Sequence, residues 1–190
     1  MSRITGLTSA TKKNLLLDAG AIYKNWVFGE DTVATSSSKL IGATVGGATL
    51  AVTPEYRQIP VDGAKGPTKG LETIDSVTAV LSATVKEMTL KALQLALPTV
   101  STTATTGYTK AVISESIADT DYVDNITYVG KISGAGDPII IVLKNALGLN
   151  GLQLQMQDKN EAGVPVALTA HYDISDLEAV PVEIYMPTVS

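Results

Sequence analysis

The stretch VTAVLSATV, Val77–Val85, alternates between apolar residues and small or polar residues, and this alternation decides the fold class. Every second side chain of a β-strand points to the same side of the sheet. The expected buried face comprises Val77, Ala79, Leu81, Ala83 and Val85. The expected opposite face comprises mostly Thr78, Ser82, Thr84 and Lys86. Strands with one buried and one polar face predict antiparallel sheets.

The same period of two predicts further strands on both sides of this stretch. GLQLQMQ, Gly151–Gln157, alternates most cleanly, and GVPVALTAHYD, Gly163–Asp173, alternates over a longer run. The other expected strands are Thr49–Gln58, Ile126–Ser133, Ile139–Asn145 and Val182–Met186. Thr49–Gln58 and Thr73–Val85 should pair as one hairpin. Gly134–Pro138 should close a second hairpin, and Asn150-Gly151 is the dipeptide that a tight two-residue turn favours.

One segment, TLKALQLALP, has the features of a helix. Thr89 is a suitable N-cap, and Pro98 marks the end of the helix. Leu90, Leu93 and Leu97 should form its apolar face. We therefore expect a mainly β protein: an antiparallel β-sandwich or partial barrel with one flanking α-helix at about residues 89–97.

The chain of 190 residues fits one domain, 1–190, and shows no internal boundary. Long loops are expected at about residues 29–39, 61–72 and 99–107. The first and third are polar and poor in large apolar residues, so they should be mobile until a partner orders them.

The composition argues against several classes of function. A net charge of −5 and a pI near 4.8 disfavour a protein built to neutralise phosphates. Cysteine is absent, which excludes thiol catalysis and thiolate metal sites, and a single histidine leaves little acid–base chemistry near neutral pH. The N-terminus lacks the apolar core of a signal peptide, and no run approaches the length of a membrane span.

Three candidate chemical motifs fail on their spacing. In VDGAKGPTKGLE, Val61–Glu72, Lys69 is followed by glycine, and a strand is expected next, so this is not a phosphate-binding loop. The carboxylates of DTDYVDN do not match a calcium-binding EF-hand loop. His171 and Asp173 form a possible pair, but no nucleophile motif accompanies them. We therefore expect no enzyme, catalytic residue, cofactor or metal.

The order of several segments resembles the major tail (tail tube) proteins of long-tailed bacteriophages, in particular the non-contractile phages of Gram-positive hosts. The matching segments are NLLLDAGAIYKN, KLIGATVGGATLAVTPEYRQIPVDGAKGPTKG, VTAVLSATVKEMTLKALQLALP and HYDISDLEAVPVEIY. The resemblance spans most of the chain and is weakest through Thr99–Asp121. It depends on the order and joint presence of these segments, because none of them is a chemical motif.

The resemblance implies a tail-tube-like β-sandwich subunit that forms hexameric rings, which stack into a hollow tube for DNA ejection. The implied location is the virion tail, after assembly in the host cytoplasm. Implied partners are further copies of the chain, a tape measure protein and tail initiation and terminator proteins. DNA would pass through the lumen without specific binding, and no membrane is involved.

The resemblance also assigns surfaces. The Val61–Glu72 loop should dock on the next ring through Asp62, Gly63, Lys65, Gly66, Lys69, Gly70 and Glu72. Polarity suggests that the lumen is lined by Glu55, Arg57, Thr78, Ser82, Thr84, Thr127 and Lys131.

Three alternatives remain open at this stage. The first is a tube subunit of a contractile tail, a bacteriocin or a secretion-like particle. The second is a monomeric β-sandwich binding module of immunoglobulin type, which would stay monomeric at high concentration. The third is a hydrolase that uses His171 with nearby carboxylates.

Overall fold

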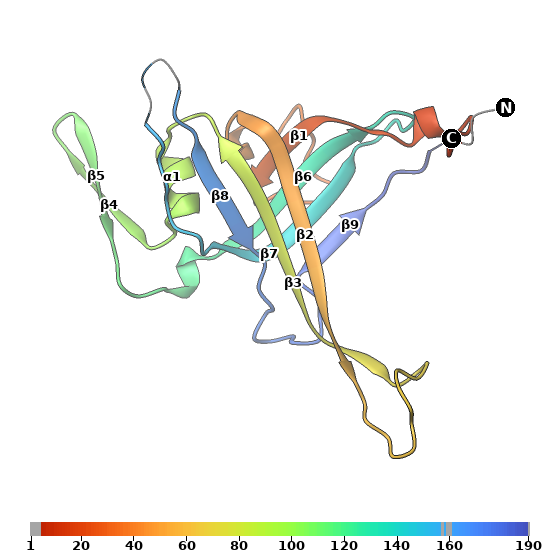
Figure 1. Cartoon of the computed structure of the whole chain (residues 1–190). Helices are drawn as coiled ribbons and strands as arrows, with labels where there is room; N and C mark the ends of the chain where they lie inside the picture. The colour runs from red at the N-terminus through yellow and green to blue at the C-terminus, as the bar shows by residue number, and fades with distance from the viewer. Residues whose placement is uncertain (1–4, 157, 159–160, 190) are drawn as a thin grey trace.

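The computed structural model describes residues 5–156, 158 and 161–189, which fold mainly into antiparallel strands. Seven of the described strands form one curled sheet in the order β1-β6-β7-β8-β3-β2, with β9 beside β7 (Figure 1). Their bounds are β1 Leu16–Lys24, β2 Thr44–Gln58, β3 Glu72–Val85, β6 Val123–Ile132, β7 Ile139–Gly148, β8 Val164–Thr169 and β9 Val182–Tyr185. The prediction of an antiparallel partial barrel with one α-helix is confirmed for the described residues.

The alternation in β3 is confirmed from Ala79 to Val85, whereas Val77, also expected on the buried face, is only half-buried. Ala79, Leu81, Ala83 and Val85 are all buried, whereas Thr78 is exposed and Ser82 and Thr84 are half-buried. The buried side chains belong to a large core that also takes in residues of β6, β7 and β8 on the same face of the sheet. A smaller cluster covers the other face of β6 and β7 and consists of Tyr23, Trp26, Val129, Ile140 and Val142. Strands β6 and β7 are therefore covered on both faces.

The helix α1, Leu90–Ala96, closes the main core against β8 and β7. Thr89 caps it as predicted, because its hydroxyl oxygen accepts a hydrogen bond from the amide of Ala92 at 3.1 Å. The predicted apolar face is wrong: the buried residues are Ala92, Leu95 and Ala96. The buried face runs through Leu95 and the two alanines, whose small side chains allow the helix to lie close to the sheet.

Close packing between α1 and β7 requires a glycine at the end of β7. A Cβ atom added to Gly148 would lie 2.2 Å from the carbonyl oxygen of Leu95, inside the contact distance of any real pair of atoms. Only a residue without a side chain allows the helix to approach the strand at this point.

The segment GLQLQMQ is not a strand, contrary to the prediction. Leu152 and Leu154 pack against the main core, so the inward alternation is real, but Met156 is exposed and no β-ladder forms. Gln157 lies outside the described residues. Asn150-Gly151 does not form the predicted tight hairpin, because only Gly151 has a positive φ. Alternation reports side-chain burial, whereas a strand also needs a backbone partner.

The expected loop at 99–107 is instead part of a hairpin. Strands β4, Val100–Thr105, and β5, Tyr108–Ile113, pair around Gly107, whose φ is +76°. The hairpin projects beyond α1 from the side of the body (Figure 1), and only Val100 is buried. Threonine and valine favour strands without needing a core beneath them, which composition alone did not reveal.

In the loop expected at 29–39, one carboxylate accepts hydrogen bonds from both ends of the segment. Asp31 accepts hydrogen bonds from the Val27 amide at 2.6 Å, the Ser36 hydroxyl at 2.7 Å and the Lys39 ammonium at 2.5 Å. These donors, with Lys39 contributing most, lower the pKa of Asp31 to about 2. These hydrogen bonds join the two ends of the segment within the described chain.

Candidate functional site

The distal part of the β2–β3 hairpin leaves the body of the molecule, and we call residues 51–78 the arm (Figure 1). Strand β8 pairs with β3 only from Val80 to Val85, so beyond that point β2 and β3 pair with each other. Val77 makes one further contact, donating its amide hydrogen to the Tyr172 hydroxyl at 2.9 Å. No residue of the arm is buried. The predicted hairpin and its projecting loop are therefore present.

One face of the arm is apolar and continues the core face of the sheet. Along β2 and β3 the register pairs Val52 with Ala79, Pro54 with Val77 and Tyr56 with Ile74. Ala79 is buried in the body, but Tyr56 and Ile74 are 67% and 54% exposed. The apolar stripe thus runs out of the core onto a surface that nothing in the described chain covers.

The other face of the arm is polar and its charges are largely satisfied. Arg57 forms an ion pair with Asp75 at 2.8 Å, and the Ser76 hydroxyl donates to the Glu55 carboxylate at 3.1 Å. Thr78 lies on the same face, opposite Thr53. The charged side chains of this face have partners, so the face can contact water or a charged polymer without presenting an unpaired cation.

The loop at the tip of the arm, residues 59–71, is built from two turns. The Ala64 amide donates to the Val61 carbonyl at 3.2 Å, and the Leu71 amide donates to the Thr68 carbonyl at 3.0 Å. Gly63 and Gly70 have φ values of +88° and +92°, which other residues rarely adopt.

The residues predicted for docking lie at this tip, with one exception. Asp62, Lys65 and Lys69 are exposed and form no ion pair with any described residue. The Gly66 carbonyl accepts from the side chains of Gln58 and Thr68. Glu72 is the exception, because it is the first residue of β3 and belongs to the strand.

Of the residues predicted to line a bore, five share one face of the hairpin. Their register places Glu55, Arg57, Thr78, Ser82 and Thr84 on the face opposite the main core. Thr127 does not fit, since it is fully buried in β6 and donates its hydroxyl hydrogen to Asn125 at 3.0 Å. Lys131 is exposed on β6, but it lies apart from the five, opposite Leu17 of β1.

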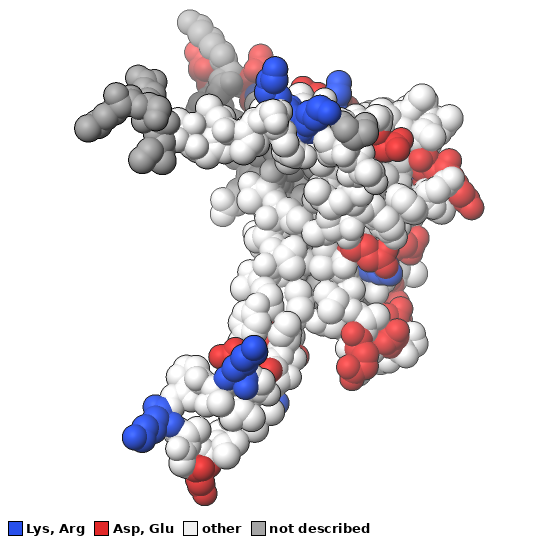
Figure 2. Space-filling view, turned by 90° about the vertical axis from the view of Figure 1, so that its right-hand side faces the viewer, with Lys and Arg blue, Asp and Glu red and all other residues white. Residues whose placement is uncertain are grey.

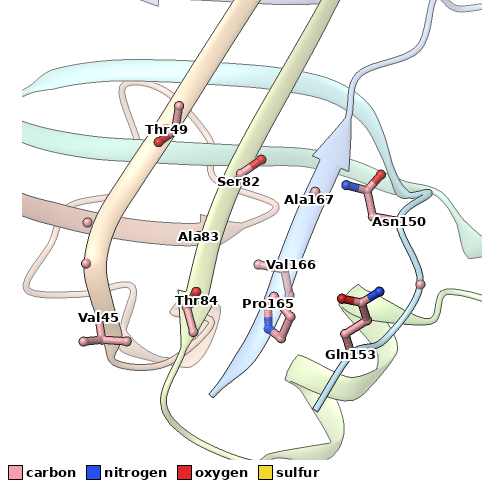
Figure 3. A pocket seen from close by; sticks show the side chains of 13 residues that line it. Val45, Thr49, Ser82, Ala83, Thr84, Asn150, Gln153, Pro165, Val166 and Ala167 are labelled. Carbon is pink, nitrogen blue, oxygen red and sulfur yellow. The ribbon is translucent and has the colours of Figure 1, made fainter. Parts of the chain in front are cut away.

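A shallow hollow lies on the same face of the sheet, over β2, β3 and β8 (Figure 3). Thr49, Ser82 and Thr84 point into it from the strands, and Asn150 and Gln153 border it from the segment that follows β7. None of the residues that line it has an acidic or basic side chain. The hollow can offer hydrogen bonds, but it has no group for proton transfer.

The structure does not join His171 and Asp173 into a hydrogen-bonded pair. The His171 Nδ1 atom lies 3.1 Å from the carbonyl oxygen of Asn145, and the ring packs edge-on against Tyr122. The Asp173 carboxylate accepts hydrogen bonds from the hydroxyl and amide of Ser175, which lower the pKa of Asp173. Among the described residues, no cluster of three or more histidine, aspartate or glutamate side chains could hold a metal ion.

Two features of this surface were missed from the sequence. The first is the β4–β5 hairpin. The second is the exposed apolar stripe on the arm, although the apolar residues at 52, 54 and 56 already alternate in VTPEYRQ. The sequence predicts a strand here but does not show where the body ends, so it does not reveal that this face is exposed.

A scan against models of protein families finds no match for the chain, and a search of curated proteins finds none. No helix in the described part of the chain is long and apolar enough to cross a membrane.

Proposed function

We propose that the chain is the structural subunit of a phage tail tube, of the non-contractile type. Copies associate into hexameric rings, the rings stack, and the tube forms a conduit for DNA ejection into the host. The subunit acts in the virion tail after assembly in the host cytoplasm, and it catalyses no reaction. The observation that carries the proposal is the arm, whose apolar face and strand edges are not covered by any of the residues that the structure describes.

The arm exposes apolar surface and open strand edges that are unfavourable in a protein that works as a monomer. Exposed apolar area favours association at roughly 25 cal/mol per Å² once it is covered. Strand β2 pairs only with β3 in the sheet, so its outer edge offers free backbone donors and acceptors along the arm. Open edges invite pairing with another chain, and proteins that must stay monomeric normally block them. Repeated association of identical subunits is the simplest use of such an element.

The charge distribution suits a conduit for DNA. An acidic chain with a net charge of −5 repels the phosphate backbone. On the proposed bore face, Arg57 is neutralised by Asp75, and the hollow around Ser82 and Thr84 is uncharged. Lys131 would lie away from this lining. DNA would pass without the multiple cation contacts that make binding tight.

The tip of the arm is the proposed contact between rings. Asp62, Lys65 and Lys69 have no partner among the described side chains, and the ordered turns at Gly63 and Gly70 hold them outward. The ends of the tube would be set by tail initiation and terminator proteins, and its length by a tape measure protein.

The first test is negative-stain microscopy of concentrated protein, beside light scattering of a dilute sample. Rings or hollow tubes are expected. Where nucleation is needed, addition of the initiation complex should trigger them. A chain that remains monomeric under both conditions would contradict the proposal and favour a binding module.

A loop replacement tests the role of the tip. Exchanging residues 60–70 for Asn-Gly joins Ile59 to Leu71, which already pair through a 2.7 Å backbone hydrogen bond. The variant should fold with unchanged thermal stability but fail to stack rings, because the docking loop is gone. Tubes of normal length from this variant would remove the loop from the stacking contact.

A further inference from the structure

The apolar face of the arm needs a specific cover. Tyr56 and Ile74 lie side by side across the two strands, and Ile59 and Val61 extend the exposed apolar surface toward the tip, at 42% and 52% exposure. Patches of this kind on a folded chain mark a contact surface. The tip adds positive charge, since residues 60–71 contain two lysines and one aspartate.

The connection between β8 and β9 has the complementary character. We call residues 173–180 the β8–β9 connection. Ile174 is 94% exposed and Leu177 is 66% exposed, which is extreme for side chains of this size. The connection also contains Asp173, Asp176 and Glu178 and no lysine or arginine. The connection therefore combines exposed apolar side chains with negative charge. The arm has exposed apolar side chains and two lysines at its tip.

The carboxylates of the connection accept local hydrogen bonds but form no ion pair with any described residue. Asp173 and Asp176 accept hydrogen bonds from residues inside the connection, at Ser175, Glu178 and Ala179. The four ion pairs among the described residues do not involve these carboxylates. Its charges are thus free to meet cations from outside, and its exposed isoleucine is free to meet an apolar surface.

The two surfaces are placed for a repeating contact. Figure 2 shows basic and acidic side chains together on the arm and further clusters of acidic side chains along the opposite side of the body. A contact between unlike surfaces on two copies can be repeated from copy to copy, and between copies in stacked rings it extends the tube. A contact between like surfaces would stop at a dimer.

We propose that the arm of one copy docks on the β8–β9 connection of a copy in the next ring. Tyr56 and Ile74 cover Ile174 and Leu177, while Lys65 and Lys69 face Asp176 and Glu178. The inference builds on the proposed self-assembly and adds the surface that receives the arm. Because both charged groups are at the rim, salt should weaken the contact.

A charge exchange tests the docking. The variant Lys65→Glu/Lys69→Glu should need a roughly tenfold higher protein concentration to assemble into tubes, since two attractive ion pairs are replaced by repulsion between like charges. Adding Asp176→Lys/Glu178→Lys should restore assembly to within about threefold of the original chain. The variant Lys12→Glu/Lys110→Glu makes the same change in net charge elsewhere and should leave the threshold unchanged.

Cross-linking tests the same contact without changing any charge. Copies labelled with ¹⁵N are mixed with unlabelled copies, assembled and treated with a carbodiimide that joins lysine directly to carboxylate. Links from Lys65 or Lys69 to Asp176 or Glu178 should include pairs of mixed isotope. Links within single copies only would show that the arm folds back on its own connection and would overturn the proposal.

The outcomes separate the two proposals. If the original chain forms no rings under any condition, the proposed function fails and the docking contact fails with it. If tubes form at the same concentration for the original chain and for Lys65→Glu/Lys69→Glu, and no mixed links appear, the function stands and only the docking contact is wrong.

Discussion

The two long hairpins of this protein use the same antiparallel pairing in opposite surroundings. In the β6–β7 hairpin, with ten residues in each strand, most side chains on both faces are buried. In the β2–β3 hairpin, with strands of 15 and 14 residues, only the part near the body contains buried side chains. In the arm beyond it, no side chain on either face is fully buried.

The buried hairpin should therefore contribute to the folding stability of the single chain, and the exposed arm to association between chains. Side chains between two packed faces contribute to the folding of a single chain, because their apolar area leaves water when the chain folds. The exposed side chains of the arm gain little from folding and can gain the same free energy only when another surface covers them. Substitutions in the two hairpins should therefore change different observables.

The largest expected effect comes from the buried hairpin. Leu143 of β7 is fully buried, so Leu143→Ala should lower the free energy of unfolding by about 2–5 kcal/mol. Tyr56→Ala in the arm should change it by no more than about 0.5 kcal/mol in dilute protein. Urea denaturation of both variants measures the contrast. A loss at Tyr56 similar to that at Leu143 would show that the arm packs within the monomer.

A smaller effect is expected where α1 meets β7. Gly148→Ala should destabilise the chain by about 1–3 kcal/mol, since the new methyl group collides with the Leu95 carbonyl and the helix must shift. Gly66→Ala in the arm is the matched control, because a Cβ there meets no atom within 4 Å and should cost little. Thermal unfolding of the pair measures this. Equal melting temperatures would contradict the close approach of helix and strand.

The smallest expected effect is a loss of local stability at low pH in the segment around Asp31. Its pKa is lowered to about 2 in the folded chain, chiefly by Lys39, so the ionised form stabilises this segment above the ordinary pKa of aspartate. That stabilisation should fall as the pH drops from about 4 toward 2. Hydrogen exchange of residues 27–39 against pH measures the loss, and Asp31→Asn should remove its pH dependence in that window. An Asp31 resonance that titrates near pH 4 would refute the assignment.

The sequence alone determined the class of the fold and several of its local features. The alternation in Val77–Val85, the turn at Gly134–Pro138 and the cap at Thr89 depend on residues close together in the chain. Each was predicted correctly, because backbone geometry and local hydrogen bonds act over a few residues. The projecting β2–β3 loop was found in the same way, since its glycines and proline cannot extend a ladder.

Only the tertiary structure decided which of these elements are covered. Alternation did not reveal that GLQLQMQ lacks a strand partner, that Thr127 is buried from both sides, or that Tyr56 and Ile74 lie beyond the end of the core. These properties depend on segments far apart in the chain, such as the Trp26 cluster that covers one face of β6. A periodic pattern states which side chains share a face, and the packed chain determines whether that face meets a neighbour or water.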